Sequence, residues 1–115
     1  MQNVRQQGIA IEKIRDALKA SVFAGEVLEG EYITDIYASD LMSDVLAFGK
    51  AGSLLLTGLN TIQAAISAYV AEFKGIIILR NKMPDTEILT FAIEKHLFVL
   101  STDADMYEAC VKIAN

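Results

Sequence analysis

The hydrophobic and polar positions of this chain alternate between two spacings after residue 50. Short, uninterrupted apolar runs predict strands buried on both faces, at 54–57 (LLLT), 75–79 (GIIIL) and 97–101 (LFVLS). Apolar residues at helical spacing follow each run and predict helices over 62–73, 85–95 and 106–113. The stripe of the first of these helices consists of Ile62, Ala65, Ile66, Tyr69, Val70 and Phe73. Strands of this kind belong to a parallel sheet with helices on both faces, so we expect a βαβαβα unit with right-handed crossovers.

The first half of the chain is less regular. Ile11, Ile14 and Leu18 lie on one face of a helix expected within residues 9–20, with charged residues on the other face. The stretch that follows is rich in β-branched and aromatic residues. It predicts two short strands joined by a turn, the second around residues 32–38.

The composition is that of one domain with a core of its own. The chain has 115 residues, and 53% of them are hydrophobic. A chain of this size can form its own core, and the hydrophobic content excludes disorder. The apolar content also leaves room for a surface patch that a second chain would cover. We therefore expect a single domain over residues 1–115 and a homodimer.

Charge and cysteine content narrow the range of partners. The net charge is −5, and the ten Lys and Arg residues are scattered through the sequence. Binding to a nucleic-acid backbone needs a concentrated positive face, so we expect no nucleic-acid partner. The one cysteine, Cys110, cannot form an internal disulfide, and the N-terminal segment is too charged for a signal peptide. No apolar run reaches the roughly 20 residues of a spanning helix, so we expect a cytoplasmic protein without a membrane partner.

The ends of the three later strands are the candidates for a ligand site. Ligands of open parallel sheets bind at the carboxyl ends of strands, where the amides of the next helix can hold an anion. Small, hydroxyl and basic side chains gather at these ends, and Lys82 adds a further positive charge. The candidate ligand-binding residues are Thr57, Gly58, Asn60, Thr61, Arg80, Thr102 and Asp103, with Asp40 and Ser43 as accessory residues.

A structural interpretation of the same residues stays open. Gly58 would then only permit a turn, and the polar residues would only cap helices. A short helix is expected at 41–49, ended by Gly49. The expected caps are Ser39 or Asp40 for this helix and, for the later ones, Asn60 or Thr61, Asp85, and Thr102 or Asp103.

Two motifs that could have indicated catalysis do not. Gly25 and Gly30 have the glycine spacing of a phosphate-binding loop, but Glu31 stands where that loop requires lysine. His96, the only histidine, is explained by the interaction of a cation with a helix C-terminus.

Metal ligands are also not evident. Cys110 follows Met106 at helical spacing, which is typical of a residue in the core. Asp35, Asp40 and Asp44 could gather around Mg²⁺, but helix capping and a solvated face explain them more simply. We therefore expect no metal and no cofactor.

Four segments together resemble a known family: SDLMSDVLA (39–47), LLLTGLNT (54–61), IIILRNKMP (76–84) and FVLSTDADMYEAC (98–110). They resemble the DRTGG domain, in its short stand-alone form, over nearly the whole chain. This module is similar to the N-terminal domain of HPr kinase/phosphorylase and is also found fused to CBS domains and to phosphate acetyltransferases. The name-giving tract itself is absent, because Leu59 and Asn60 stand where its second glycine is expected.

The resemblance implies an α/β fold, a three-layer α/β/α arrangement with a mixed, mainly parallel sheet, similar to the HPr kinase N-terminal domain. It also implies pairing through a homodimeric interface. In HPr kinase, catalysis belongs to a separate C-terminal domain with a phosphate-binding loop and a histidine. This chain has no such catalytic motif, so we expect no serine-kinase activity and no enzyme.

Three functional hypotheses follow. The first is a non-catalytic regulatory domain that binds a nucleotide or another phosphorylated metabolite at the strand ends and acts on a larger metabolic or redox protein. The second is a homodimerisation or protein-interaction module with no small ligand, which is compatible with the first. The third is an enzyme, for which the sequence offers no nucleophile with its base and no acid–base pair of carboxylates.

Overall fold

A five-stranded mixed sheet forms the middle layer of the protein, in the order β2-β7-β6-β5-β4. The computed structural model describes residues 8–25 and 29–114. The strands of this sheet are β2 Ser21–Ala24, β4 Ile36–Ala38, β5 Leu54–Thr57, β6 Gly75–Ile78 and β7 Phe98–Ser101. Strands β4 to β7 run parallel to one another and β2 runs antiparallel to β7. The predicted parallel arrangement of the three later strands is therefore confirmed.

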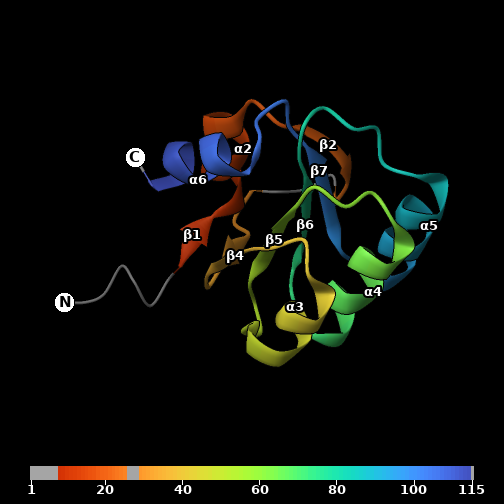
Figure 1. Cartoon of the computed structure of the whole chain (residues 1–115). Helices are drawn as coiled ribbons and strands as arrows, with labels where there is room; N and C mark the ends of the chain where they lie inside the picture. The colour runs from red at the N-terminus through yellow and green to blue at the C-terminus, as the bar shows by residue number, and fades with distance from the viewer. Residues whose placement is uncertain (1–7, 26–28, 115) are drawn as a thin grey trace.

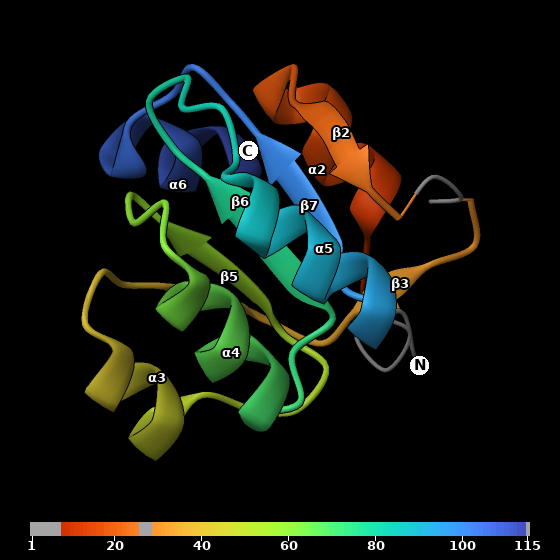
Figure 2. The ribbon, with the colours of Figure 1, turned by 90° about the vertical axis from the view of Figure 1, so that its right-hand side faces the viewer.

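Helices cover both faces of this sheet, which confirms the predicted three-layer α/β/α fold (Figure 1). They are α2 Ile11–Leu18, α3 Met42–Phe48, α4 Ile62–Val70, α5 Thr86–Lys95 and α6 Met106–Ala114. Figure 2 shows α3, α4 and α5 side by side on one face, with α2 and α6 on the other.

The two faces of the central strands form two separate cores. Successive side chains of a strand point to opposite faces. Leu54 and Leu56 therefore pack with residues of α2 and α6, whereas Leu55 packs with residues of α3, α4 and α5. Strands β6 and β7 divide in the same way. This is why the strands read as continuous apolar runs rather than as an alternation.

Helix α4 lies between α3 and α5 and buries small side chains. Its buried residues are Ala64, Ala65, Ser67 and Ala68. The predicted apolar stripe is partly wrong, because Tyr69 is 44% exposed and Val70 is 62% exposed. Small side chains allow the helix backbone to approach the sheet and both neighbouring helices, so size rather than hydrophobicity selects the buried face.

The first half of the chain differs most from the prediction. The two early strands lie at opposite edges of the large sheet, where β2 joins β7 and β4 joins β5. The stretch expected as one strand around residues 32–38 is two strands, β3 Tyr32–Ile33 and β4. The turn expected between Gly25 and Gly30 includes residues 26–28, which lie outside the described residues.

A second, two-stranded sheet accounts for the start of the first helix. Strand β3 pairs antiparallel with β1 Ile9–Ala10. The helix predicted within residues 9–20 therefore begins at Ile11 and ends at Leu18. Ile9 and Ala10 are extended because β3 supplies hydrogen-bond partners for their backbone groups.

Helix α6 places Cys110 on its outer face. Ala109 is buried against α2 and the sheet, whereas Cys110, one residue later, is exposed. The expectation that Cys110 fills the core is wrong, because the next residue of a helix points about 100° away from its neighbour. Within the described residues, no helix is long and apolar enough to cross a membrane.

Candidate functional site

The carboxyl ends of β4, β5, β6 and β7 meet at one edge of the sheet, because these strands run parallel. The loops that follow them carry Asp40, Thr57, Arg80 and Thr102 respectively. Strand order then decides which of these residues become neighbours. The ends of β4, β5 and β6 are adjacent, while β7 is separated from β5 by β6.

Asp40 accepts two hydrogen bonds at the end of β5. Its Oδ1 accepts the hydroxyl of Thr57 at 2.9 Å and the backbone N–H of Gly58 at 2.6 Å. The Thr57 hydroxyl in turn accepts the N–H of Leu59 at 3.2 Å. Thr57 is completely buried, so these bonds fix its side chain in one orientation. Asp40 thus binds the strand end of β5. It was expected as a cap of α3 and does not have that role.

Arg80 lies against Gly58 from the neighbouring strand end. A Cβ atom added to Gly58 would lie 2.9 Å from Nη2 of Arg80 and 3.4 Å from Oδ2 of Asp40. The absence of a side chain at Gly58 therefore lets the guanidinium and the carboxylate approach the same point of the backbone. Arg80 itself is exposed to solvent.

The backbone of Arg80 and Asn81 is held in the left-handed region, at φ of 61° and 57°. This conformation is uncommon outside glycine and persists only where the surroundings enforce it. Here the N–H of Arg80 donates to the carbonyl of Ala104, and that of Asn81 to the carbonyl of Thr102. The chain after β7 thereby sets the direction in which Arg80 leaves the sheet.

Lys82 and Asn60 tie the two loops together. Lys82 Nζ donates to the carbonyl of Gly58, and the Asn60 side chain donates to the carbonyl of Met83 at 2.7 Å. Asn60 Oδ1 also accepts the N–H of Asp85 at 3.1 Å. Asn60 therefore joins the loop after β5 to the start of α5 and is not the expected cap of α4.

The end of β7 is built differently. Thr102 is buried, and its hydroxyl donates to the carbonyl of Leu18 at 2.7 Å, which anchors α2. Asp103 is exposed and is not the cap of α6. That role belongs to Asp105, whose carboxylate accepts the N–H of Glu108 at 2.8 Å while Glu108 Oε1 accepts the N–H of Asp105 at 3.3 Å. The Thr102 side chain thus binds α2 rather than the group around Gly58, although its carbonyl accepts the N–H of Asn81.

The remaining candidates are at the surface. Thr61 is the residue before α4 and Asp85 the residue before α5, but neither side chain makes a capping hydrogen bond. Ser43 lies exposed in the first turn of α3, and the hydroxyl of Ser39 accepts the N–H of Leu41. Ser39 therefore supports the turn into α3 without occupying the cap position.

Hydrogen-bond donors and positive charge gather at this edge of the sheet. A hydroxyl, a backbone N–H and two cationic side chains, those of Arg80 and Lys82, converge around Gly58. Such donors hold phosphate or carboxylate oxygens. Within the described residues, no group of three His, Cys, Asp or Glu side chains could hold a metal ion. His96 ends α5 at the opposite edge of the sheet and takes no part here.

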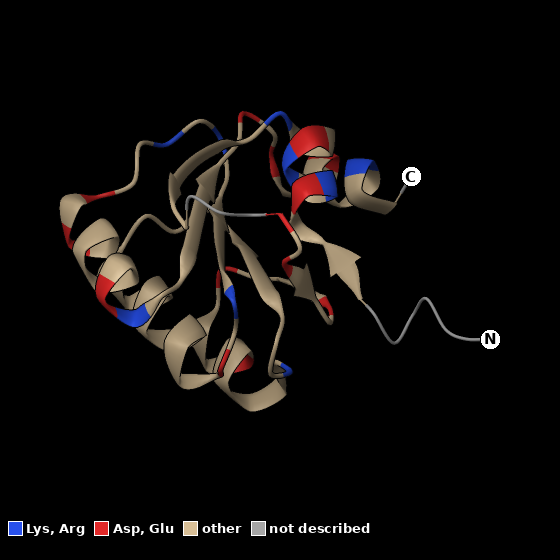
Figure 3. Ribbon diagram, turned by 180° about the vertical axis from the view of Figure 1, so that it is seen from behind, with Lys and Arg blue, Asp and Glu red and all other residues tan. Residues whose placement is uncertain are grey.

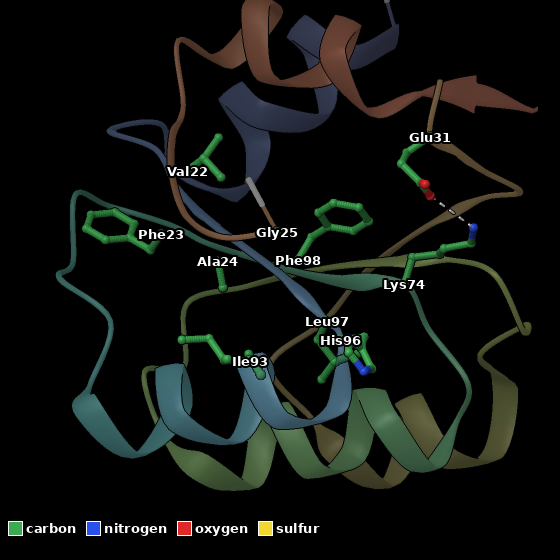
Figure 4. Close-up of a pocket in the computed structure, with 11 residues that line it drawn as sticks. Val22, Phe23, Ala24, Gly25, Glu31, Lys74, Ile93, His96, Leu97 and Phe98 are labelled. Carbon is green, nitrogen blue, oxygen red and sulfur yellow. Dashed lines mark ion pairs between the residues drawn. The ribbon is translucent and has the colours of Figure 1, made fainter. Parts of the chain in front are cut away.

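A pocket of about 780 Å³ lies at that opposite edge, beside the amino ends of β6 and β7 (Figure 4). Its walls are mainly apolar and include Phe23, Ile93 and Phe98. No pattern in the sequence indicates this pocket, because it is formed by segments distant along the chain. Lys74 and Glu31 at its rim form an ion pair at 3.5 Å, so these two charges offset each other. The pocket therefore offers weaker attraction to a phosphate than the edge around Gly58.

Charges elsewhere are mixed in sign. Figure 3 shows acidic and basic residues interspersed along α2 and α6, while the strands of the large sheet carry no charge. In the part of the chain that the structure describes, Arg80 and Lys82 are the basic residues at the carboxyl edge of β5 and β6.

Comparisons with known proteins identify the fold. No family model matches the chain, and no curated protein matches it. Among solved structures, the chain is similar to the CBS and DRTGG domains of the regulatory region of Clostridium perfringens pyrophosphatase, complexed with its activator diadenosine tetraphosphate. The TM-score is 0.81 at 14% identity, and the match covers 98% of this chain and 50% of that one. This chain therefore spans half the length of that neighbour, and the likeness supports the DRTGG-like fold that the four sequence segments predicted.

Proposed function

We propose that this chain is a non-catalytic regulatory domain of the DRTGG family, formed by residues 1–115, that binds a nucleotide or another phosphorylated metabolite. The site is the carboxyl edge of β5 and β6, with Thr57, Gly58 and Arg80 as the main contacts and Asn60 and Lys82 as their support. Binding of this ligand would regulate a larger metabolic or redox protein in the cytoplasm.

One observation carries this proposal: Arg80 lies over a glycine whose N–H and neighbouring hydroxyl are both hydrogen-bond donors. Guanidinium and backbone donors around one point favour a phosphate group, because bonds to a charged acceptor are about twice as strong as neutral ones. The fold adds support, since the similar pyrophosphatase region is regulatory and is complexed with a nucleotide activator.

The test is a thermal-shift and calorimetric titration with ATP and with diadenosine tetraphosphate. A ligand at 100 times its Kd stabilises the folded state by about 2.7 kcal/mol. Arg80→Gln removes the charge, keeps most of the side-chain length and is expected to weaken binding about tenfold, the equivalent of one charged hydrogen bond.

Lys112→Gln is the matched control, because it removes the same charge from the exposed last turn of α6. Its affinity for both compounds is expected to equal that of the wild type. The proposal is refuted if neither compound stabilises the wild-type protein at millimolar concentration. If both variants weaken ligand binding equally, the effect of Arg80→Gln comes from net charge and not from a contact at the site.

A second function, homodimerisation without a small ligand, is favoured by exposed apolar side chains on α3, α4 and α5. Phe48 is 67% exposed, Val70 is 62% exposed and Ile93 is 65% exposed. Exposed apolar side chains on neighbouring helices are typical of a subunit interface.

Light scattering at micromolar concentration tests this second function. We expect a dimer that Phe48→Ser converts to a monomer. Tyr107→Ser is the control, because Tyr107 is a 79% exposed aromatic residue on α6, on the other side of the sheet. A monomeric wild type would count against an interface role.

A further inference from the structure

The donors at the end of β5 already have an anionic partner. The Thr57 hydroxyl and the Gly58 N–H both donate to the Asp40 carboxylate. A carboxylate oxygen and a phosphate oxygen accept the same kind of hydrogen bond and carry charge of the same sign. A phosphate that uses these two donors must therefore displace Asp40.

The segment that carries Asp40 buries few side chains. It follows β4, a three-residue strand at the edge of the sheet, and leads into α3, a seven-residue helix. Val45 is the one residue of α3 that is buried, whereas Leu46 and Phe48 are more than half exposed. Elements with few buried contacts open at low free-energy cost. Movement of Asp40 would thus involve β4 and α3 rather than the central strands.

Arg80 and Lys82 can interact with the Asp40 carboxylate or with a phosphate. Arg80 Nη2 and Asp40 Oδ2 approach the same position at Gly58, and Lys82 binds the carbonyl of Gly58 itself. The positive charge of Arg80 thus lies near the carboxylate when no ligand is bound. With Asp40 displaced, the same two charges would face the phosphate.

From these observations we infer that Asp40 is a built-in competitor for the ligand site. In the ligand-free protein its carboxylate occupies the position of the phosphate, and the ligand binds by exchange with it. Release of Asp40 allows the loop between β4 and α3 to move. This movement changes the surface of the molecule when the ligand binds. This inference rests on the proposed function, because it assigns the regulation of the same site.

Competition of this kind lowers the apparent affinity in a predictable way. The apparent Kd equals the intrinsic Kd divided by the fraction of molecules in which Asp40 has left the donors. Removing the carboxylate makes that fraction approach one. Removal also eliminates the repulsion between the carboxylate and a phosphate, so both effects act in the same direction.

The experiment is calorimetric titration of the full chain with ATP and with diadenosine tetraphosphate. Asp40→Asn removes the charge with little change in shape, and Asp40→Ala removes the acceptors as well. Both are expected to bind about tenfold more tightly than the wild type, within the usual range of coupling between two sites. Asp44→Asn is the control, because it removes a carboxylate from the first turn of α3 and should leave the affinity unchanged.

Hydrogen exchange of the wild-type protein tests the movement without any substitution. Ligand binding is expected to increase exchange in residues 36–48, whereas most ligands slow exchange near their site. Asp40→Ala without ligand should show the same increase. Unchanged or slower exchange of this segment on ligand binding would overturn the inference, even if the Asp40 variants fold poorly.

The outcomes separate the two proposals. Equal or weaker binding by Asp40→Asn, alongside clear binding by the wild type, overturns the role of Asp40 and leaves the proposed ligand site standing. If the wild type and both Asp40 variants fail to bind at millimolar concentration, the proposed function is refuted and this inference falls with it.

Discussion

Gly58 and Gly75 both occupy positions where a side chain would meet another atom, but the atoms differ in kind. At Gly58 the neighbour is the end of the Arg80 side chain, which can move. At Gly75 an added Cβ would lie 2.3 Å from the backbone oxygen of Phe98 and 2.8 Å from its nitrogen. These atoms belong to the paired strand β7 and cannot retreat without breaking the ladder. Gly75 is thus a structural requirement, whereas Gly58 leaves room for the Arg80 guanidinium.

Gly75→Ala is expected to lower the free energy of unfolding by about 3 kcal/mol, at the upper end of the cost of overpacking. Urea denaturation followed by circular dichroism measures this change. Gly30→Ala is the control. Its φ of 80° carries a strain of about 1 kcal/mol, but no atom lies within 4 Å of an added Cβ. Equal losses for the two variants would contradict this requirement, because the contact with Phe98 is what distinguishes Gly75 from Gly30.

At the scale of the element, polar side chains expected to cap helices instead bind other parts of the chain. None of the helices α2 to α5 has a hydrogen bond from a capping side chain. Asp40 and Asn60, both expected as caps, instead bind the strand end of β5 and the loop before α5. Only long-range contacts distinguish a cap from a cross-link, because both use the same short polar residues.

Helix α6 is the exception, because the Asp105 side chain caps its N-terminus. Asp105→Ala removes one side of the reciprocal pair with Glu108 and is expected to cost about 1 kcal/mol of unfolding free energy. Asp103→Ala removes the same charge two residues earlier, at an exposed position, and should change stability by less than about 0.5 kcal/mol. Thermal melts of both variants provide the measurement, and equal effects would attribute the loss to net charge alone.

At the scale of the whole molecule, one sheet serves two cores. Leu55 and Leu56 are adjacent in β5 and completely buried, yet they pack in different layers. The layers share the backbone of β5, β6 and β7, so neither face can lose its packing without disturbing the strands of the other. We expect the two layers to unfold together.

Leu55→Ala and Leu56→Ala are each expected to lower the unfolding free energy by about 3 kcal/mol, the typical cost of such a cavity. Each variant should retain a single transition, with coincident near- and far-ultraviolet circular dichroism. Leu46→Ala, at a 51% exposed position of α3, should change stability by less than about 0.5 kcal/mol. Two separate transitions in either core variant would show that the layers are independent.

Much of the second half of the protein was predictable from sequence. The runs at 54–57, 75–79 and 97–101 coincide with β5, β6 and β7 to within one residue at each end, and their parallel direction was expected. The reason is local, since a strand buried on both faces needs apolar residues at every position. The first half was harder to predict, because short strands such as β3 and β4 form only by pairing with strands distant in the sequence.

The candidate site was predictable in composition but not in arrangement. Thr57, Gly58 and Arg80 were expected near one another because parallel strands end at one edge. The contact of Asp40 with Gly58 and the hydrogen bond of Thr102 to Leu18 were not expected, because the two partners are 18 and 84 residues apart. The pocket beside Lys74 and Phe98 left no sequence signal for the same reason.

The sequence by itself determined which segments are strands and helices in the second half, the α/β class and the residue types at the strand ends. These properties depend on the spacing of apolar residues and on backbone preferences that act over a few residues. The tertiary structure decided the order of the strands, the side on which each helix packs and the partner of each polar side chain. Those properties depend on contacts between residues distant in the chain, and such contacts exist only after the sheet has assembled.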